Sequence, residues 1–267
     1  MLLLIYFFAI LSSAFASATF RVVNGQPGDI RDFPYLASLQ HRNIVRCGAS
    51  IINKRTVITA SHCFKDVILE KLFVRAGTKF GEKQGQLVPV KYYLMHPDYV
   101  PLTQNNDIAI VWTKNNLDFS PSVQPIAMAQ SDASLPVGKM GVVAGWGRMG
   151  EKKGFPDIFH YAFLPVIERT KCVKSGGGGY DDFRITDKMF CAGFMGVGGT
   201  DSCKSDSGGP FVVDNTLVGV VSFGQGCARK KFPGVYVNVA VFRKWVDENL
   251  ELENAGKLNA TSGIKYV

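Results

Sequence analysis

Charged side chains are missing from the beginning of the chain, where residues 2–16 read LLLIYFFAILSSAFA. This apolar run is too short to span a membrane comfortably and ends in small residues, which is typical of a signal peptide. Cleavage fits after Ala16, giving a signal peptide at residues 1–16, or after Ala18, although no Lys or Arg precedes the run. A buried N-terminal helix is the alternative. No later uncharged run reaches the ~20 residues that a membrane span needs, so we expect a secreted, extracellular protein without a membrane segment.

The sequence also lacks the usual signs of a metal site. No CxxC motif occurs, and the four histidines are scattered. The six cysteines all lie beyond the apolar run, at Cys47, Cys63, Cys172, Cys191, Cys203 and Cys227. An even number of cysteines in a secreted chain favours three disulfides, although their spacing alone leaves all fifteen pairings open. We therefore expect disulfides and no bound metal.

Long basic stretches are absent as well, although the net charge is +8. The basic clusters are short, at Lys152–Lys153 and Arg229–Lys231, and no aromatic residues alternate with them. This pattern does not favour nucleic-acid binding. The glycine-rich segment at residues 175–182 is not followed by the Lys-Ser or Lys-Thr of a phosphate-binding loop, so we interpret it as a surface loop.

Few long helical patterns are present, whereas the chain has 28 glycines and 12 prolines. Short apolar runs such as TVITA, DIAIVW, GVVAG and LVGVVSF are rich in β-branched residues and are bounded by turn residues. They predict strands of an all-β barrel or sandwich. One helix is predicted at residues 241–250, where apolar residues recur at helical spacing. The tail at residues 251–267 is polar and contains a glycosylation sequon at Asn259.

Three segments carry residues suited to nucleophilic catalysis. His62 lies in TASHC, Asp107 in NNDIAIVW and Ser207 in SDSGGP. A serine hydroxyl is a weak nucleophile at neutral pH, and it needs a base whose tautomer is fixed by a carboxylate. Each segment alone is more typical of ordinary structure. Their joint occurrence, in the order His, Asp, Ser, indicates a catalytic triad and does not match the Ser, Asp, His order of a lipase or esterase.

These segments, together with RVVNG, GWG, DSCKSDSGGP, VSFGQGC and PGVYV, closely resemble the trypsin-like branch of the chymotrypsin family of serine proteases. The resemblance covers residues 21–250. It implies two packed six-stranded antiparallel β-barrels, a C-terminal helix and an active site between the barrels. It also implies a monomeric serine endopeptidase that acts on proteins or peptides, without a cofactor, and that protein protease inhibitors can bind.

The resemblance implies a role for each catalytic residue. Ser207 attacks the scissile carbonyl, His62 acts as the base, and Asp107 orients His62. Ser222 helps to hold Asp107. The implied disulfides join Cys47 with Cys63, Cys172 with Cys191, and Cys203 with Cys227.

The resemblance further implies a zymogen with a propeptide at residues 17–21 and a protease domain at residues 22–250. Cleavage after Arg21 would free the amine of Val22, which would pair with Asp206. Asp201 would form the floor of the primary pocket and bind Arg or Lys, while Gly224 and Gly234 would leave room for the long side chain. The basic cluster Arg229–Lys231 follows Cys227 near the expected pocket rim and would favour acidic flanking residues in a substrate.

One position departs from the family pattern Gly-Asp-Ser-Gly-Gly-Pro, because Ser205 replaces the first glycine. In the family, this residue and the nucleophile, here Ser207, donate the backbone N–H groups of the oxyanion hole. If the position requires a positive φ, a serine is strained there. An active but slower protease is the first expectation. The alternative is a weakly active or inactive homologue that acts as a secreted binding or immune-cofactor protein.

Overall fold

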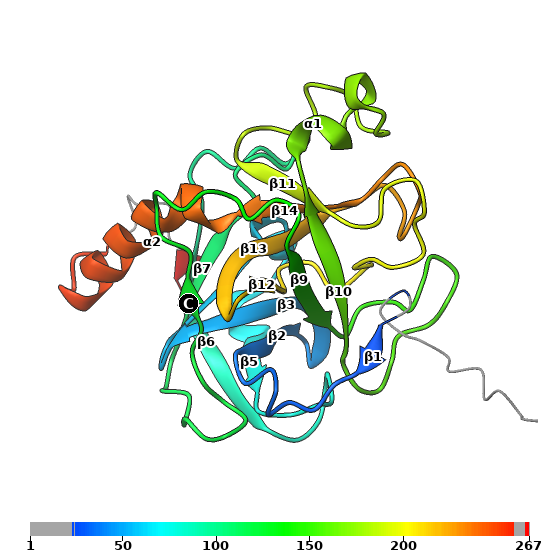
Figure 1. Cartoon of the computed structure of the whole chain (residues 1–267). Coiled ribbons are helices and arrows are strands. Elements are labelled where there is room, and N and C mark those ends of the chain that lie inside the picture. The colour runs from blue at the N-terminus through cyan, green and yellow to red at the C-terminus, as the bar shows by residue number, and fades with distance from the viewer. Residues whose placement is uncertain (1–22, 24, 259–264, 267) are drawn as a thin grey trace, which may run out of the picture.

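Two β-barrels make up most of the computed structural model, which describes residues 23, 25–258 and 265–266 (Figure 1). The predicted signal peptide and propeptide, the Val22 amine and the sequon at Asn259 lie outside these residues. The first barrel closes in the order β2-β3-β4-β7-β6-β5. Its strands are β2 (Leu36–His41), β3 (Ile44–Asn53), β4 (Thr56–Thr59), β5 (Leu72–Ala76), β6 (Gln86–Met95) and β7 (Ala109–Thr113).

The second barrel closes in the order β9-β10-β11-β14-β13-β12. Its strands are β9 (Met140–Gly145), β10 (His160–Ile167), β11 (Met189–Ala192), β12 (Pro210–Val213), β13 (Thr216–Phe223) and β14 (Gly234–Asn238). All pairings within both barrels are antiparallel. The predicted fold of two six-stranded antiparallel barrels is therefore confirmed.

Several shorter strands and helices lie outside the twelve barrel strands. The added strands are β1 (Gln26–Pro27), β8 (Ala127–Met128) and β15 (Lys265–Tyr266); the helices outside the C-terminal one are η1 (Ser61–Phe64), η2 (Leu69–Lys71), α1 (Arg169–Cys172) and η3 (Lys174–Gly176). β1 pairs with β10, and β8 runs parallel to β13.

Local sequence explains how the barrels form. All five residues of β7, AIVWT, are buried, as expected for a strand covered on both sides. Two hairpins turn through residue pairs with positive φ, at Arg42–Asn43 and Asp214–Asn215. Two such residues make the tight turn that matches the twist of paired strands, and Asn and Asp tolerate it well.

The two barrels share one continuous core. Ala144, Phe159 and Val212 of the second barrel or its connections pack in the same buried cluster as Leu39 and Ile58 of the first. Burying a large apolar side chain stabilises a fold by roughly 1.5–3 kcal/mol. The shared core therefore fixes the seam between the barrels.

The C-terminal helix α2 (Val239–Asn254) begins two residues before the predicted range and ends four residues after it. The side chain of Asn238 caps it by accepting a hydrogen bond from the Ala240 N–H. At its far end, Glu253 accepts a hydrogen bond from the Tyr92 hydroxyl and lies near Arg55. The polar end of the helix therefore contacts the first barrel. The periodicity of apolar residues could not predict these polar contacts, so it predicted a shorter helix. In the described part of the chain, no helix combines the length and the apolar character needed to cross a bilayer.

The C-terminal strand β15 covers an edge of the first barrel. β5 pairs with β6 only at Gln86–Pro89, so the following part of β6 lacks a neighbour on that side. β15 takes this place, with Lys265 opposite Tyr93 and Tyr266 opposite Tyr92. An unpaired strand edge exposes backbone groups and invites association. The strand β15, which follows the second barrel in the chain, thus pairs with a strand of the first barrel.

Deleting residues 259–267 should lower the thermal stability modestly and leave catalysis unchanged. Losing one or two backbone hydrogen bonds at about 1 kcal/mol each should lower Tm by roughly 2–8 °C. Calorimetric scans at one fixed rate would measure this shift. The double variant Lys265→Pro and Tyr266→Pro keeps the tail length but removes the strand donors, and it should match the deletion. A Tm equal to that of the intact chain in both variants would show that β15 adds no stability.

Candidate active site

His62 is positioned by strand register and a disulfide. β4 pairs with β7 so that Thr59 lies opposite Ala109, which brings η1, just after β4, next to the residues before β7. The Ser61 hydroxyl donates to the carbonyl of Ile108 over 2.6 Å. The Cys47–Cys63 disulfide ties η1 to β3. The backbone on both sides of His62 is therefore held in place.

The carboxylate of Asp107 is completely buried and receives three hydrogen bonds. The His62 backbone N–H donates to Oδ1 over 2.8 Å, and His62 Nδ1 lies 2.7 Å from Oδ2. The Ser222 hydroxyl, from β13 of the second barrel, donates to Oδ2 over 2.6 Å. An ionised carboxylate only accepts hydrogen bonds, so Nδ1 of His62 carries the hydrogen and Nε2 is left as the acceptor.

Ser207 lies in a turn that is held by both barrels. Its carbonyl accepts a hydrogen bond from the Gly48 N–H of β3, and the next N–H, of Gly208, donates to the carbonyl of Val221 in β13. Ser207 lines the same cavity as His62. The described contacts contain no hydrogen bond between the Ser207 hydroxyl and the His62 ring. The structure thus brings the three predicted catalytic residues to one site, with the bonded chain running through Ser222, Asp107 and His62.

The cavity has a volume of about 400 Å³, and Asp201 lies in it with 2% of its surface exposed. Asp201 Oδ2 accepts a hydrogen bond from the Ala228 N–H over 3.1 Å. Burial raises the pKa of Asp201 to about 7, against the lowering effect of its backbone hydrogen bonds. Ser222, Gly224 and Gly234 line the same cavity, which places the predicted pocket residues together.

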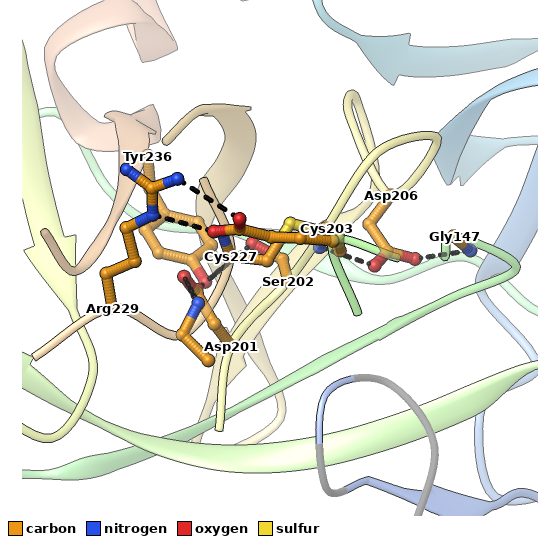
Figure 2. The surroundings of a disulfide bond; sticks show 10 residues. Gly147, Asp201, Ser202, Cys203, Asp206, Cys227, Arg229 and Tyr236 are labelled. Carbon is orange, nitrogen blue, oxygen red and sulfur yellow. Dashed lines mark hydrogen bonds and ion pairs between the residues drawn. A yellow bond between two sulfur atoms is a disulfide. The ribbon is translucent and has the colours of Figure 1, made fainter. Parts of the chain in front are cut away.

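Asp206 is a second buried acid, next to Ser207. Its two oxygens accept hydrogen bonds from the backbone N–H groups of Gly147 and Cys203, over 2.8 and 2.9 Å. Figure 2 shows these two bonds beside the Cys203–Cys227 disulfide. Burial raises the pKa of Asp206 to about 6. No basic side chain that the structure describes forms an ion pair with it.

Ser205 has a φ of +73°, in the left-handed region. The position therefore adopts the conformation that favours glycine. The family pattern alone did not establish whether φ is positive here. A side chain with a Cβ costs about 1–2 kcal/mol in this conformation. No acceptor among the described residues takes the backbone N–H of Ser205 or of Ser207.

The six cysteines pair as the resemblance implies, Cys47 with Cys63, Cys172 with Cys191 and Cys203 with Cys227. The paired cysteines are 16, 19 and 24 residues apart in the chain. Closing a loop of such a length stabilises a fold by roughly 3 kcal/mol on the chain-entropy model. One group in the described part of the chain has ligand atoms close enough for a metal, namely Cys47, His62 and Cys63. Both sulfurs are in a disulfide, so this group has no thiolate to offer.

Glu151 is among the cavity residues that sequence reasoning missed. It lies in the connection between β9 and β10, lines the cavity and forms an ion pair with Arg229. The two residues are far apart in the chain, and no motif links them, so their contact had no sequence signal. Arg229 is thus paired with an acidic side chain of the protein itself.

Comparisons with known proteins agree with this geometry. The family model described as Trypsin matches residues 22–246. A vitellin-degrading protease of Bombyx mori is 37% identical over 248 residues, which is 91% of this chain and 92% of that protein. Trypsin 5G1 of Aedes aegypti is 39% identical over 232 residues, which is 85% of this chain and 84% of that protein.

The solved structure of mouse neuropsin, a serine protease expressed in the limbic system of the brain, has a similar fold. The TM-score is 0.75 at 29% sequence identity, covering 85% of this chain and 98% of the neuropsin chain. The family match, the relatives and the similar fold lead to one conclusion. The chain belongs to the trypsin family and is a trypsin-like serine endopeptidase.

Proposed function

We propose that the protein is a secreted endopeptidase that hydrolyses peptide bonds after Arg or Lys. One observation carries this specificity: the buried carboxylate of Asp201 lies in the cavity that Ser207 and His62 also line. A desolvated carboxylate binds a guanidinium or ammonium group through charge-assisted hydrogen bonds. A Cβ at Gly234 would lie 2.6 Å from Asp201 Oδ1, so the absence of a side chain keeps the carboxylate accessible.

The proposed reaction proceeds through an acyl-enzyme. Nε2 of His62 takes the proton of the Ser207 hydroxyl as its oxygen attacks the carbonyl, and later gives that proton to the leaving amine. Asp107 holds the His62 tautomer and stabilises the imidazolium. A water molecule, activated by the same imidazole, then hydrolyses the ester at Ser207.

The backbone N–H groups of Ser205 and Ser207 form the proposed oxyanion hole. They are aimed at the charge that develops on the carbonyl oxygen, and losing one such donor typically costs 10²–10³-fold in kcat. Ser205 keeps its N–H, so the donor is present. Its left-handed conformation is strained, however, and a flipped peptide would relieve that strain at the expense of the hole.

Activation by cleavage after Arg21 fits the surroundings of Asp206. A buried carboxylate without a cation is unfavourable, which its raised pKa reflects. The freed amine of Val22 supplies the missing charge. The bridge between Val23 and Asp201 supports this proposal, because it brings the residue after Val22 to the segment that ends at Asp206.

The relatives support a protein-degrading role, because their names are trypsins and a vitellin-degrading protease. We propose protein or peptide substrates, a monomeric enzyme, and protein protease inhibitors as binding partners. The strain at Ser205 favours one second candidate, a weakly active or inactive homologue that acts as a binding protein.

Cleavage profiling of the activated protein should show bonds cut after Arg and Lys. Asp201→Asn should lower kcat/KM for an Arg substrate by about 10²–10³-fold, because the guest cation then lacks its charged partner in a buried site. Faster cleavage of Phe or Leu substrates than of Arg substrates by the parent enzyme would contradict the proposed specificity. Organophosphate labelling of Ser207, absent in Ser207→Ala, would exclude the inactive homologue.

Binding of benzamidine, a small amidinium ion, should weaken as the pH falls from 8 to 6. Asp201 is neutral below its pKa of about 7, and only its ionised form attracts the cation. The dissociation constant should therefore rise about tenfold over this range. Calorimetry in buffers of different ionisation enthalpy should also detect proton release on binding at pH 6. A dissociation constant that is the same at pH 6 and pH 8 would argue against this account of Asp201.

Ser205→Gly should raise kcat/KM severalfold, with a ceiling near the tenfold that corresponds to about 1.4 kcal/mol. Glycine adopts the left-handed conformation without strain, so the oxyanion hole stays assembled. Ser205→Ala is the matched control, since it keeps the Cβ and removes only the hydroxyl, and it should show no gain. Equal rates for the glycine variant and the parent enzyme would show that the serine is tolerated.

A further inference from the structure

The loop between β9 and β10 is fastened at two places near the cavity. At its start, the Gly147 N–H donates to Asp206, and the Arg148 N–H donates to the carbonyl of Lys204 over 2.8 Å. A few residues later, Glu151 reaches across to the segment that follows β13. The loop therefore connects the buried acid beside the nucleophile with the far wall of the cavity.

The carboxylate of Glu151 is fully engaged in that contact. Its Oε1 accepts hydrogen bonds from Arg229 Nε over 2.7 Å and from the Cys227 backbone N–H over 3.0 Å. Its Oε2 accepts a hydrogen bond from Arg229 Nη2 over 3.1 Å. Figure 2 shows the guanidinium of Arg229 with its dashed bonds. The hydrogen bonds from Arg229 and Cys227 lower the pKa of Glu151 to about 2, so the contact stays charged at every pH at which the enzyme would work.

The next peptide of the same wall is held by the pocket carboxylate. The Ala228 N–H donates to Asp201 Oδ2, so two consecutive N–H groups, of Cys227 and Ala228, bind two different carboxylates. Ala228 has a φ of +59°, and a Cβ on Gly226 would collide with Glu151 Oε1. The wall at residues 226–229 has an unusual backbone shape that these contacts maintain.

From this geometry we infer that Glu151, fixed by Arg229, is a positioning residue that holds residues 226–229 in the shape that binds a cationic substrate side chain. The inference rests on the proposed function, because it needs Asp201 to receive that side chain. Without Glu151, the Cys227 N–H loses its acceptor and the wall samples other arrangements. The guest must then select the competent arrangement, which lowers its apparent affinity by the fraction that remains competent.

The test compares activated variants in their affinity for benzamidine and in the kinetics of an Arg anilide substrate. Glu151→Ala and Arg229→Ala should each raise the inhibition constant and KM by about threefold to tenfold, the range expected for a bidentate but partly exposed pair. The kcat should stay within about twofold. The double variant should resemble either single variant, since both remove the same contact.

Two further variants separate positioning from general damage. Glu151→Gln keeps an oxygen for the Cys227 N–H and should recover part of the affinity lost in Glu151→Ala. Lys139→Ala removes the exposed Lys139–Asp214 ion pair, outside the cavity, and should change neither constant. An unchanged inhibition constant in both Glu151 variants, or an equal effect of Lys139→Ala, would overturn the inference. Failure of the parent enzyme to bind benzamidine or to cut after Arg would instead reject the proposed function.

Discussion

The site depends on one buried carboxylate that both barrels share. Asp107 accepts two hydrogen bonds from His62 of the first barrel and one from Ser222 of the second. Burying a charged group is unfavourable unless several donors satisfy it, and neither barrel supplies all of them. The full set of donors to Asp107 is therefore assembled only when the two barrels pack on their common core. The shared core and the shared carboxylate constrain the same seam.

The other two buried acids of the site lack such partners. Asp107 is satisfied by His62 and Ser222, whereas Asp201 and Asp206 receive mainly backbone N–H groups and have raised pKa values. A neutral donor offsets only part of the cost of desolvating a charge. Each of these two carboxylates would therefore be stabilised by a cation that another group supplies. In our proposal, the substrate side chain binds Asp201 and the Val22 amine binds Asp206.

Sequence motifs predicted the fold and the identity of the site residues, because the segments around His62, Asp107 and Ser207 are local and carry a family pattern. They could not predict contacts between segments that share no pattern. Glu151 and Arg229 come into contact only in the folded chain. The strand β15 forms because part of β6 has an unpaired edge, and the periodicity of the sequence does not indicate such an edge. The sequence predicts strain at Ser205 only if that residue has a positive φ, and the value of φ comes from the structure alone.

The strained serine, the buried acid and the nucleophile are consecutive residues, and this adjacency couples their energetics. Rotating the peptide between Lys204 and Ser205 would relieve the strain at Ser205 and withdraw one donor from the proposed oxyanion hole. The hydrogen bond from the Arg148 N–H to the Lys204 carbonyl opposes that rotation, and Arg148 lies in the loop that carries Glu151 to the cavity wall. The cavity wall and the strained turn are thus both hydrogen-bonded to the same loop. In our proposal, substrate binding and the assembly of the oxyanion hole therefore both depend on the hydrogen bonds that hold this one loop.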